Sequence, residues 1–239
     1  MSTITTVMRR ATNYDDPGSL GSRLRARRSE LLVRELAAIH AEKGHVDVID
    51  IGGTRSYWNA IQGDVLTRYD VTVTVVNLPG EPHPEDDDRF RFREGNGCDL
   101  QDVADLQFDL AHANSVLEHV GRWPEMRAFA AEVRRVARGY VVQTPYFWFP
   151  VEPHFMAPVF HWLPESSRAR LLQRLPLGHS GRAESLDVAL SRVQSATLVD
   201  ATMFRALFPD AQVQFERLAG LPKSLIGIRS ATGPSAPRP

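Results

Sequence analysis

The sequence has a single cysteine, Cys98, among 239 residues. One thiol cannot form a disulfide within the chain, which excludes a disulfide-rich scaffold and fits a reducing compartment. The sequence also lacks an apolar run of about 18 residues, the length that a membrane-spanning helix needs. No apolar segment typical of a signal peptide follows Met1. These absences predict a cytoplasmic protein without a membrane span.

The chain also lacks a surplus of charge of either sign. Its 28 Lys and Arg residues nearly balance 29 Asp and Glu residues, which leaves a formal net charge of −1. Nucleic-acid-binding domains usually carry a basic surplus, so this balance argues against a nucleic acid as a partner. One basic cluster lies near the start of a predicted helix: Arg23, Arg25, Arg27 and Arg28. It fits either a solvated helix face or a contact with an anion or partner, and it is the only feature that supports an RNA substrate.

Two nucleotide-binding fingerprints are missing as well. The sequence contains neither GxGxxG nor GxxxxGK[ST], which argues against a dehydrogenase and excludes P-loop chemistry. The segment 46–54, VDVIDIGGT, takes their place: an apolar run reaches Asp50 and then breaks at Gly52 and Gly53. Such a pattern is typical of a buried parallel strand that ends in a tight turn. Glycine lets the backbone of that turn approach a ligand closely.

The polar residues around this turn favour one cofactor. Asp50 suits a ligand with a positive amino group, and S-adenosylmethionine carries an amino group and a sulfonium but no phosphate. The next predicted strand ends at Asn77, where nucleotide-binding sheets commonly hold the ribose. An asparagine there can accept a hydrogen bond from one hydroxyl and donate one to the other. The segment therefore predicts an S-adenosylmethionine site.

Strand and helix patterns alternate along the chain. Strands are predicted at 46–51, 71–78, 89–95, 108–113, 139–144, 211–218 and 224–229, and helices at 22–43, 55–62, 124–138, 165–175 and 196–207. Ser22 can cap the first helix and Gly44 can end it. Residues 176–194 are predicted to be irregular. The rhythm predicts an α/β fold with a doubly wound, mostly parallel sheet.

The predicted organisation is one domain with two loose ends. Residues 1–20 form a flexible N-terminus, 21–231 a single domain, and 232–239 a disordered tail. Residues 145–194 form an insertion of loop and helix on the side of the sheet where a second substrate, the acceptor, would bind. Its first part is a long loop crowded with aromatic residues: Tyr146, Phe147, Trp148, Phe149, Phe155, Phe160 and Trp162. They fit the wall of an apolar pocket and a satellite of the core equally well.

Five motifs in a fixed order give the chain a family resemblance. They are FDLAHANSVLEHV at 108–120, QTP at 143–145, FPVEPHF at 149–155, HWLP at 161–164 and FPDA at 208–211. Over about residues 46–230 the chain resembles the class I S-adenosylmethionine-dependent methyltransferases, in their bacterial small-molecule branch (methyltransferase type 11-like). The resemblance implies a single Rossmann-like, seven-stranded sheet with the last strand antiparallel and helices on both faces. It also implies in-line methyl transfer to a small-molecule acceptor.

The resemblance implies roles for particular residues. Asp50, Gly52, Gly53 and Thr54 would line the methionine part of the cofactor; Asn77 would face the ribose and Leu78 the adenine; Asn96, Gly97 and Cys98 would lie at the adenine edge; Asn114 and Ser115 would lie beneath the sulfonium. Asn77 and Asn96 are amides where the family often has acids. This departure keeps a catalytically silent binding or regulatory module as the alternative function.

An acceptor oxygen must lose a proton, and histidine is the natural base near neutral pH. The catalytic residues predicted are His119 first, then His154, with Glu152 as a carboxylate that orients a histidine; His119 also fits a structural role. Glu152, His154 and His161 are suitable metal ligands, but a role in shaping the pocket or holding the loop is favoured, and no metal is predicted. The aromatic loop suits a small or lipid-linked acceptor, such as a sugar or a secondary metabolite. O- or N-methylation and the oligomeric state stay open.

Overall fold

The computed structural model describes residues 20–61, 63–178 and 181–232, with side chains from Arg28 onward. The flexible N-terminus and nearly all of the disordered tail predicted from the sequence lie outside these residues. Helix α2 spans Leu20–Lys43. Ser22 therefore lies inside the helix, and the prediction that it caps the helix is wrong. Gly44 follows α2 with a φ of 80° and donates its N–H to the carbonyl of His40 at 2.8 Å, as expected for a glycine that ends a helix.

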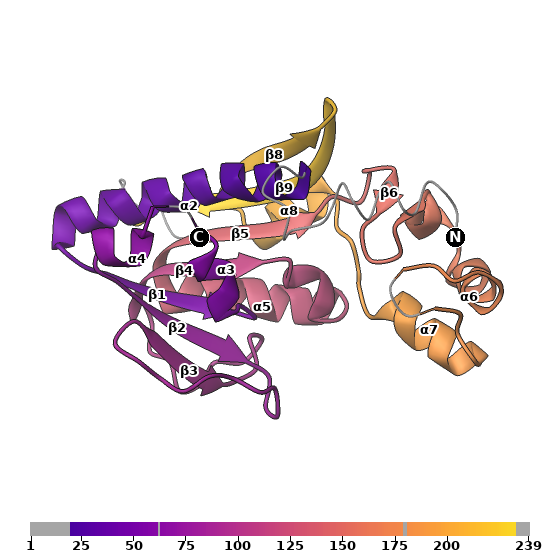
Figure 1. Cartoon of the computed structure of the whole chain (residues 1–239), viewed down its shortest axis with the longest axis horizontal. Coiled ribbons are helices and arrows are strands. Elements are labelled where there is room, and N and C mark those ends of the chain that lie inside the picture. The colour runs from indigo at the N-terminus through magenta and orange to yellow at the C-terminus, as the bar shows by residue number, and fades with distance from the viewer. Residues whose placement is uncertain (1–19, 62, 179–180, 233–239) are drawn as a thin grey trace.

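Seven strands form one sheet in the order β3-β2-β1-β4-β5-β9-β8 (Figure 1). Their bounds are β1 Val46–Ile51, β2 Val71–Asn77, β3 Phe90–Glu94, β4 Phe108–Asn114, β5 Ala137–Pro145, β8 Gln212–Leu218 and β9 Leu221–Arg229. Strands β1 to β5 pair in parallel, whereas β9 pairs antiparallel with both β5 and β8. This topology confirms the predicted fold. The strand order reverses between β1 and β4, and ligands of open α/β sheets bind at the carboxyl ends beside such a point.

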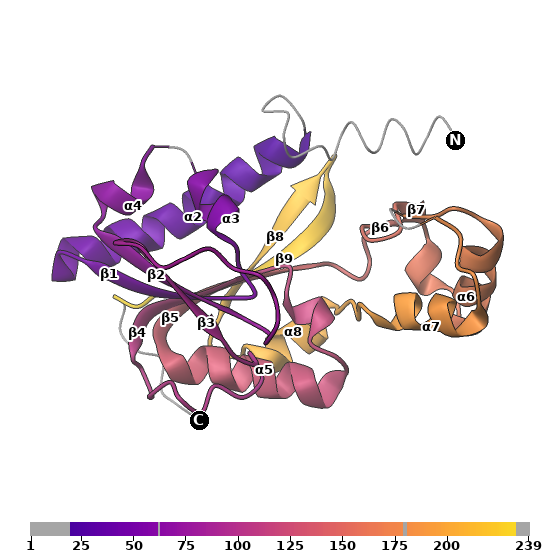
Figure 2. The ribbon, with the colours of Figure 1, turned by 60° about the horizontal axis from the view of Figure 1, so that its bottom comes forward.

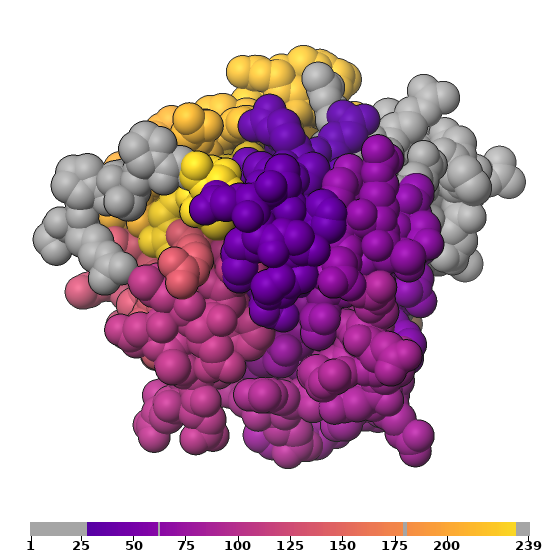
Figure 3. All heavy atoms as spheres, turned by 90° about the vertical axis from the view of Figure 1, so that its left-hand side faces the viewer, coloured from indigo at the N-terminus to yellow at the C-terminus, as the bar shows by residue number. Residues whose placement is uncertain are grey.

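Helices cover both faces of the sheet (Figure 2). On one face lie α2, α3 (Arg55–Asn59) and α4 (Val65–Arg68); on the other lie α5 (Trp123–Val136) and α8 (Ala201–Leu207). Each face has its own cluster of buried apolar side chains, because strands covered on both sides are apolar throughout. Figure 3 shows α2 in indigo between the yellow C-terminal strands and the purple segments that follow β1. The sequence pattern missed α4, which has a single turn.

A second body, which we call the cap lobe (residues 146–199), lies beyond the carboxyl ends of the parallel strands (Figures 1 and 2). It holds the hairpin β6 (Val151–Glu152) and β7 (Ala157–Pro158), the 3-10 helix η2 (Phe160–Trp162), and helices α6 (Glu165–Arg174) and α7 (Leu186–Gln194). The lobe has its own core, made of Ala157, Phe160, Ala169, Leu172, Ala183, Ala189 and Val193. Its division from the rest as an insertion at 145–194 stays a prediction.

The cap lobe is where the sequence predictions of local structure are least accurate. Residues 186–194 form α7, so the prediction of an irregular segment over 176–194 is wrong there. Ser185 caps this helix by accepting a hydrogen bond from the N–H of Val188 at 3.2 Å. The helix predicted from 196 begins only at Ala201, because Asp200 caps it. None of the helices in the described part of the chain is both long enough and apolar enough to cross a membrane.

Candidate active site

The glycine turn after β1 is shaped by the protein's own side chains. Gly52 has a φ of 72°, and a Cβ on it would lie 2.7 Å from Val116 at the end of β4. A Cβ on Gly53 would lie 1.7 Å from a carboxylate oxygen of Asp50. Thr54 then caps α3 by accepting a hydrogen bond from the N–H of Tyr57 at 3.3 Å. Both glycines are therefore required by contacts within the chain, and the turn they form is bare backbone.

Asp50 is fully buried, and both of its carboxylate oxygens have partners. One accepts a hydrogen bond from Nε1 of Trp58 at 2.7 Å, and the other lies 2.7 Å from Nδ1 of His112. Trp58 and His112 were not singled out from the sequence, although His112 lies in the 108–120 motif. Asp50 thus fixes the glycine turn from beneath, and its direct contact with a cofactor amino group stays a prediction.

Asn77 joins the end of β2 to the same turn. Its Nδ2 donates to the carbonyl oxygen of Gly53 at 3.1 Å, and its Oδ1 can still accept a hydrogen bond. An ionised aspartate could not donate to that carbonyl, which gives a physical reason for an amide at this position. The next residue, Leu78, is 60% exposed at the same edge of the sheet.

The turn after β3 has a similar internal design. The Oδ1 of Asn96 accepts a hydrogen bond from the N–H of Cys98 at 3.0 Å. A Cβ on Gly97 would lie 2.7 Å from Cγ2 of Ile51. Burial and the charge of Glu125 raise the pKa of the Cys98 thiol. A raised pKa disfavours the thiolate, which is the nucleophilic form of a cysteine.

Arg28 of α2 reaches the end of β4, where the sulfonium was predicted to lie. Its Nη1 donates to Oδ1 of Asn114 at 2.9 Å, and its Nε lies 3.0 Å from Oε1 of Glu216. The Arg28 side chain is only 10% exposed. For Arg28 the interpretation as a solvated face is therefore wrong: its side chain contacts an amide and a carboxylate of the same chain. Beside it, Ser115 has a φ of 57° and donates its hydroxyl to Oε1 of Gln143 at 3.0 Å.

The three residues predicted to be catalytic form one continuous chain of contacts. Nε2 of His119 lies 3.2 Å from Nε2 of His154, and Nδ1 of His154 lies 2.6 Å from Oε1 of Glu152. Burial alone would lower the pKa of His154, but the hydrogen bond and the charge of Glu152 outweigh it, so the pKa of His154 is raised. His161, which was also considered, lies apart with its Nε2 2.6 Å from the carbonyl oxygen of Phe147, and burial lowers its pKa.

Glu118 is a buried acid beside this chain that sequence reasoning did not assign. It belongs to the 3-10 helix η1 (Leu117–His119) and is 1% exposed. Its Oε2 accepts a hydrogen bond from Thr144 at 2.9 Å, whereas its Oε1 has no partner among the described residues. Burial raises the pKa of the Glu118 carboxyl. Its place directly before His119 was the signal available in the sequence.

The comparisons with known proteins identify a family whose matched segment includes the strands that form this edge of the sheet. Residues 49–141 match a family model described as a methyltransferase domain. The chain therefore contains a methyltransferase domain. The matched residues span β1 to β5 of the sheet, and the cofactor of such a domain is S-adenosylmethionine. A search of curated proteins finds no match.

Several solved structures are similar to this methyltransferase. An O-methyltransferase family protein from Burkholderia thailandensis has a TM-score of 0.47 and 17% identity, over 89% of this chain and 59% of that one. An S-adenosylmethionine-dependent methyltransferase from Methanosarcina mazei has a TM-score of 0.44 and 14% identity, over 77% of this chain and 91% of that one. The third is the 1,6-didemethyltoxoflavin-N1-methyltransferase of B. thailandensis, with bound 1,6-didemethyltoxoflavin and S-adenosylhomocysteine. It has a TM-score of 0.45 and 16% identity, over 82% of this chain and 75% of that one. All three TM-scores are below 0.5, so the assignment rests on the family model and the strand order.

A cavity of about 110 Å³ lies in the cap lobe, on the side where Arg122 of the sheet-bearing part closes it. Its lining includes Glu152, Phe155 and His161 from the cap lobe and Arg122 from the start of α5. Glu152 therefore lines this cavity and also contacts His154. The chain His119–His154–Glu152 lies next to a space that can hold part of a small molecule.

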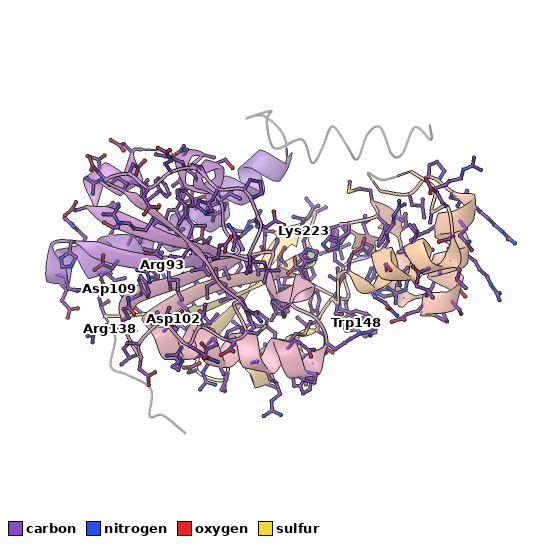
Figure 4. The ribbon with its side chains drawn as sticks, turned by 90° about the horizontal axis from the view of Figure 1, so that it is seen from below. Arg93, Asp102, Asp109, Arg138, Trp148 and Lys223 are labelled. Carbon is purple, nitrogen blue, oxygen red and sulfur yellow. The ribbon has the colours of Figure 1, made fainter. Side chains whose placement is uncertain are left out.

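The aromatic residues of the 145–164 segment divide between the two roles left open. Phe147 and Phe155 line the cavity, whereas Phe160 is in the core of the cap lobe and Tyr146 packs on the core of the sheet. Trp148 is 56% exposed and lies where the cap lobe meets the rest of the molecule (Figure 4). The interpretation as a satellite of the core is therefore correct for Phe160, whereas Phe147 and Phe155 line a cavity whose other walls are largely charged and polar.

Proposed function

We propose that this methyltransferase moves the methyl group of S-adenosylmethionine to an oxygen or nitrogen atom of a small molecule held between the sheet edge and the cap lobe. The observation that carries the proposal is the chain of contacts from His119 through His154 to Glu152 beside the cavity. A sugar, a lipid-linked molecule or another secondary metabolite fits this description. The net charge of −1 gives no support for a nucleic-acid substrate.

The cofactor would lie over the glycine turn, at the carboxyl ends of β1, β2 and β4. We assign it the residues Asp50, Gly52, Gly53, Thr54, Asn77, Leu78, Asn96, Gly97, Cys98, Asn114 and Ser115. Asp50 would act mainly by holding the turn, because Trp58 and His112 already engage its oxygens. Backbone groups of the turn and the Oδ1 of Asn77 would make the polar contacts. The exposed face of Leu78 would pack on the adenine.

In this proposal the histidines supply the base. The sulfonium already activates the methyl group, so the protein mainly aligns donor and acceptor, which is worth up to about 7–11 kcal/mol in the best intramolecular models. The acceptor proton would pass to Nε2 of His119 or His154. Glu152 accepts a hydrogen bond from His154 and stabilises its charged form. Glu152 is therefore a positioning residue and His119 the first candidate base.

A labelled-methyl assay tests the proposal. The purified protein is incubated with methyl-labelled S-adenosylmethionine and a panel of phenols, sugars, hydroxy acids and amines, and S-adenosylhomocysteine and methylated products are measured. We expect turnover on at least one small acceptor, and we expect His119→Ala to lower kcat by about 100-fold or more. The dissociation constant for S-adenosylmethionine should change little.

His83→Ala is the matched control, because His83 is exposed in the loop between β2 and β3 and contacts Phe92. Unchanged kcat in His119→Ala would remove His119 from the mechanism. Tight cofactor binding with no turnover on any acceptor would favour the silent binding module instead.

A further inference from the structure

The end of β4 and the cap lobe bring three potential metal ligands together. Glu118 and His119 lie in η1, directly after β4, and His154 lies between β6 and β7 of the cap lobe. One ligand atom from each lies within 4.8 Å of the other two. The sequence had suggested a different combination, in which His161 joined Glu152 and His154. That combination does not form, since His161 is turned to the carbonyl of Phe147.

The Nδ1 atoms of the two histidines have acceptors as partners, whereas their Nε2 atoms have only each other. Nδ1 of His119 lies 2.8 Å from the carbonyl oxygen of Ser195, and Nδ1 of His154 lies 2.6 Å from the carboxylate of Glu152. Both partners are acceptors, so both Nδ1 atoms carry the hydrogen. When both rings are neutral, each presents a lone pair at Nε2, and the two Nε2 atoms lie 3.2 Å apart. Either a proton shared between these two atoms or a cation held between the rings removes the repulsion.

The spacing of the ligands suits a divalent transition-metal ion. Zinc binds histidine nitrogen at about 2.0–2.1 Å, and angles of roughly 90–110° at the metal put two ligands about 2.8–3.4 Å apart. The observed 3.2 Å between the Nε2 atoms of His119 and His154 falls within this range. Glu118 supplies the third ligand, because its buried Oε1 has no hydrogen-bond partner among the described residues.

The surroundings also match those of a metal site. Metal-bound histidines usually donate their other N–H to a carboxylate or a backbone carbonyl, which fixes the ring. Glu152 does this for His154, and the Ser195 carbonyl does it for His119. Glu118 is buried, whereas His119 is exposed, so the ion would be anchored on one side and open on the other. Two histidines and one carboxylate with open positions are a known ligand set for divalent transition metals.

We propose that Glu118, His119 and His154 bind one divalent transition-metal ion, of the Zn²⁺, Mn²⁺, Fe²⁺ or Co²⁺ class. Binding of the ion follows from the cluster geometry and does not depend on which acceptor is used. Its use in catalysis does rest on the proposed function: with an ion in the position of the shared proton, the two Nε2 atoms would be ligands instead of bases, and an acceptor oxygen bound to the ion would lose its own proton to solvent more easily.

Calorimetric titration of the metal-free protein with Zn²⁺, Mn²⁺ and Co²⁺ tests the proposal without any acceptor present. We expect one ion per chain, and we expect His154→Ala and Glu118→Gln each to weaken binding by about 100-fold or more, since each removes a ligand. Glu152→Gln should weaken it by about 10- to 100-fold, as outer-shell changes do. Metal analysis of protein purified without chelator gives a second readout.

His45→Ala is the matched control, because His45, Asp47 and Asp109 form the other group with metal-ligand spacing in the described part of the chain. It should bind the ion as the wild type does. Retained S-adenosylmethionine binding shows that each variant is folded, and His119→Gln replaces any variant that is not. Absence of stoichiometric binding of all three ions to the wild type, or full binding to a folded His154→Ala, would overturn the proposal. Absence of turnover alone would count only against the proposed function.

Discussion

The carboxyl edge of the sheet and the cap lobe place their polar groups in opposite ways. At the sheet edge, polar side chains form hydrogen bonds within the chain and stabilise two turns; they are Asp50, Asn77 and Asn96. Where the cap lobe meets η1, the Nε2 atoms of His119 and His154 have only each other as partners at 3.2 Å, and Oε1 of Glu118 has no partner among the described residues. The proposed function would therefore have the sheet edge recognise the cofactor by backbone shape, whereas the junction keeps titratable groups available.

The two regions also have separate apolar cores, which matched leucine substitutions can distinguish. Leu110 in β4 and Leu172 in α6 are both fully buried. Either leucine replaced by alanine should cost about 2–5 kcal/mol through lost contacts and the cavity that remains. We expect Leu172→Ala to raise amide hydrogen exchange in the cap lobe alone and to reduce turnover more than cofactor binding. Leu110→Ala should raise exchange in the sheet.

Hydrogen exchange followed by mass spectrometry, with and without S-adenosylmethionine, measures both effects in one experiment. Cofactor protection of the sheet should persist in Leu172→Ala. Equal exchange throughout the molecule in both variants would mean that the cap lobe and the sheet unfold as one unit, and the comparison between them would fail.

Gly53→Ala should have the next largest effect, because it tests recognition by backbone shape directly. The added Cβ would overlap a carboxylate oxygen of Asp50, which is itself fixed by Trp58 and His112. Either Asp50 or the turn must move. We expect a loss of about 2–3 kcal/mol of stability, in the upper range for single substitutions, and at least tenfold weaker cofactor binding by calorimetry.

Gly220→Ala is the control for the cost of removing a glycine. Gly220 has a φ of 83° in the β8–β9 hairpin, with no atom within 4 Å of an added Cβ, so that substitution carries backbone strain but no clash. It should leave cofactor affinity unchanged. If Gly53→Ala binds S-adenosylmethionine as well as Gly220→Ala does, the shape of the turn does not control recognition.

The difference between the regions also explains what the sequence could predict. Periodicity located all seven strands, and VDVIDIGGT located the turn, because a buried parallel strand followed by glycines is a local pattern. The sequence also led to His119, His154 and Glu152 as a group, because histidine is the natural base near neutral pH and a carboxylate can orient it. Partners brought together by folding were not visible: Arg28 reaches Asn114 over 86 positions, and His112 reaches Asp50 over 62.

The cap lobe was harder to predict because its elements are short and its core is small. The α7 helix has nine residues, and β6 and β7 have two residues each. Such segments carry little periodic signal, and contacts in the folded lobe decide their conformation. Glu118 was missed for a related reason: its burial and its unpartnered oxygen exist only once Thr144 and His154 are placed around it.

Asn77→Asp should have a smaller effect. The substitution removes the hydrogen bond from Nδ2 to the Gly53 carbonyl and places a carboxylate against that oxygen. We expect a loss of about 1 kcal/mol, the usual net value of one hydrogen bond, measured as a shift in the urea midpoint. Asn77→Ala serves as the control, since it removes the donor without adding charge. Greater stability in Asn77→Asp than in Asn77→Ala would show that the turn tolerates an acid there.

The smallest effects concern two charged contacts, one on α5 beside the sheet and one on α6 of the cap lobe. The hydrogen bond from Arg135 lowers the pKa of Glu132 on α5, and contacts with Gln194 and Arg122 lower the pKa of Glu165 on α6. A carboxyl whose pKa is lowered on folding contributes stability above its unfolded pKa, and that stability is lost as the pH falls through the folded value. Both contributions should therefore be present at neutral pH and vanish in acid.

Their exposure decides which of the two is larger. The Glu132 side chain is 16% exposed and that of Glu165 is 36% exposed, so solvent screens the second more. We expect Glu132→Gln to lower the unfolding free energy at neutral pH by less than about 1 kcal/mol, and Glu165→Gln to change it still less. Urea titrations at pH 7 and about pH 3.5 measure this, and the deficit of Glu132→Gln should shrink in acid. A larger deficit for Glu165→Gln would instead show that Glu165, which joins α6 to the start of α5, is a main tie between the cap lobe and the sheet.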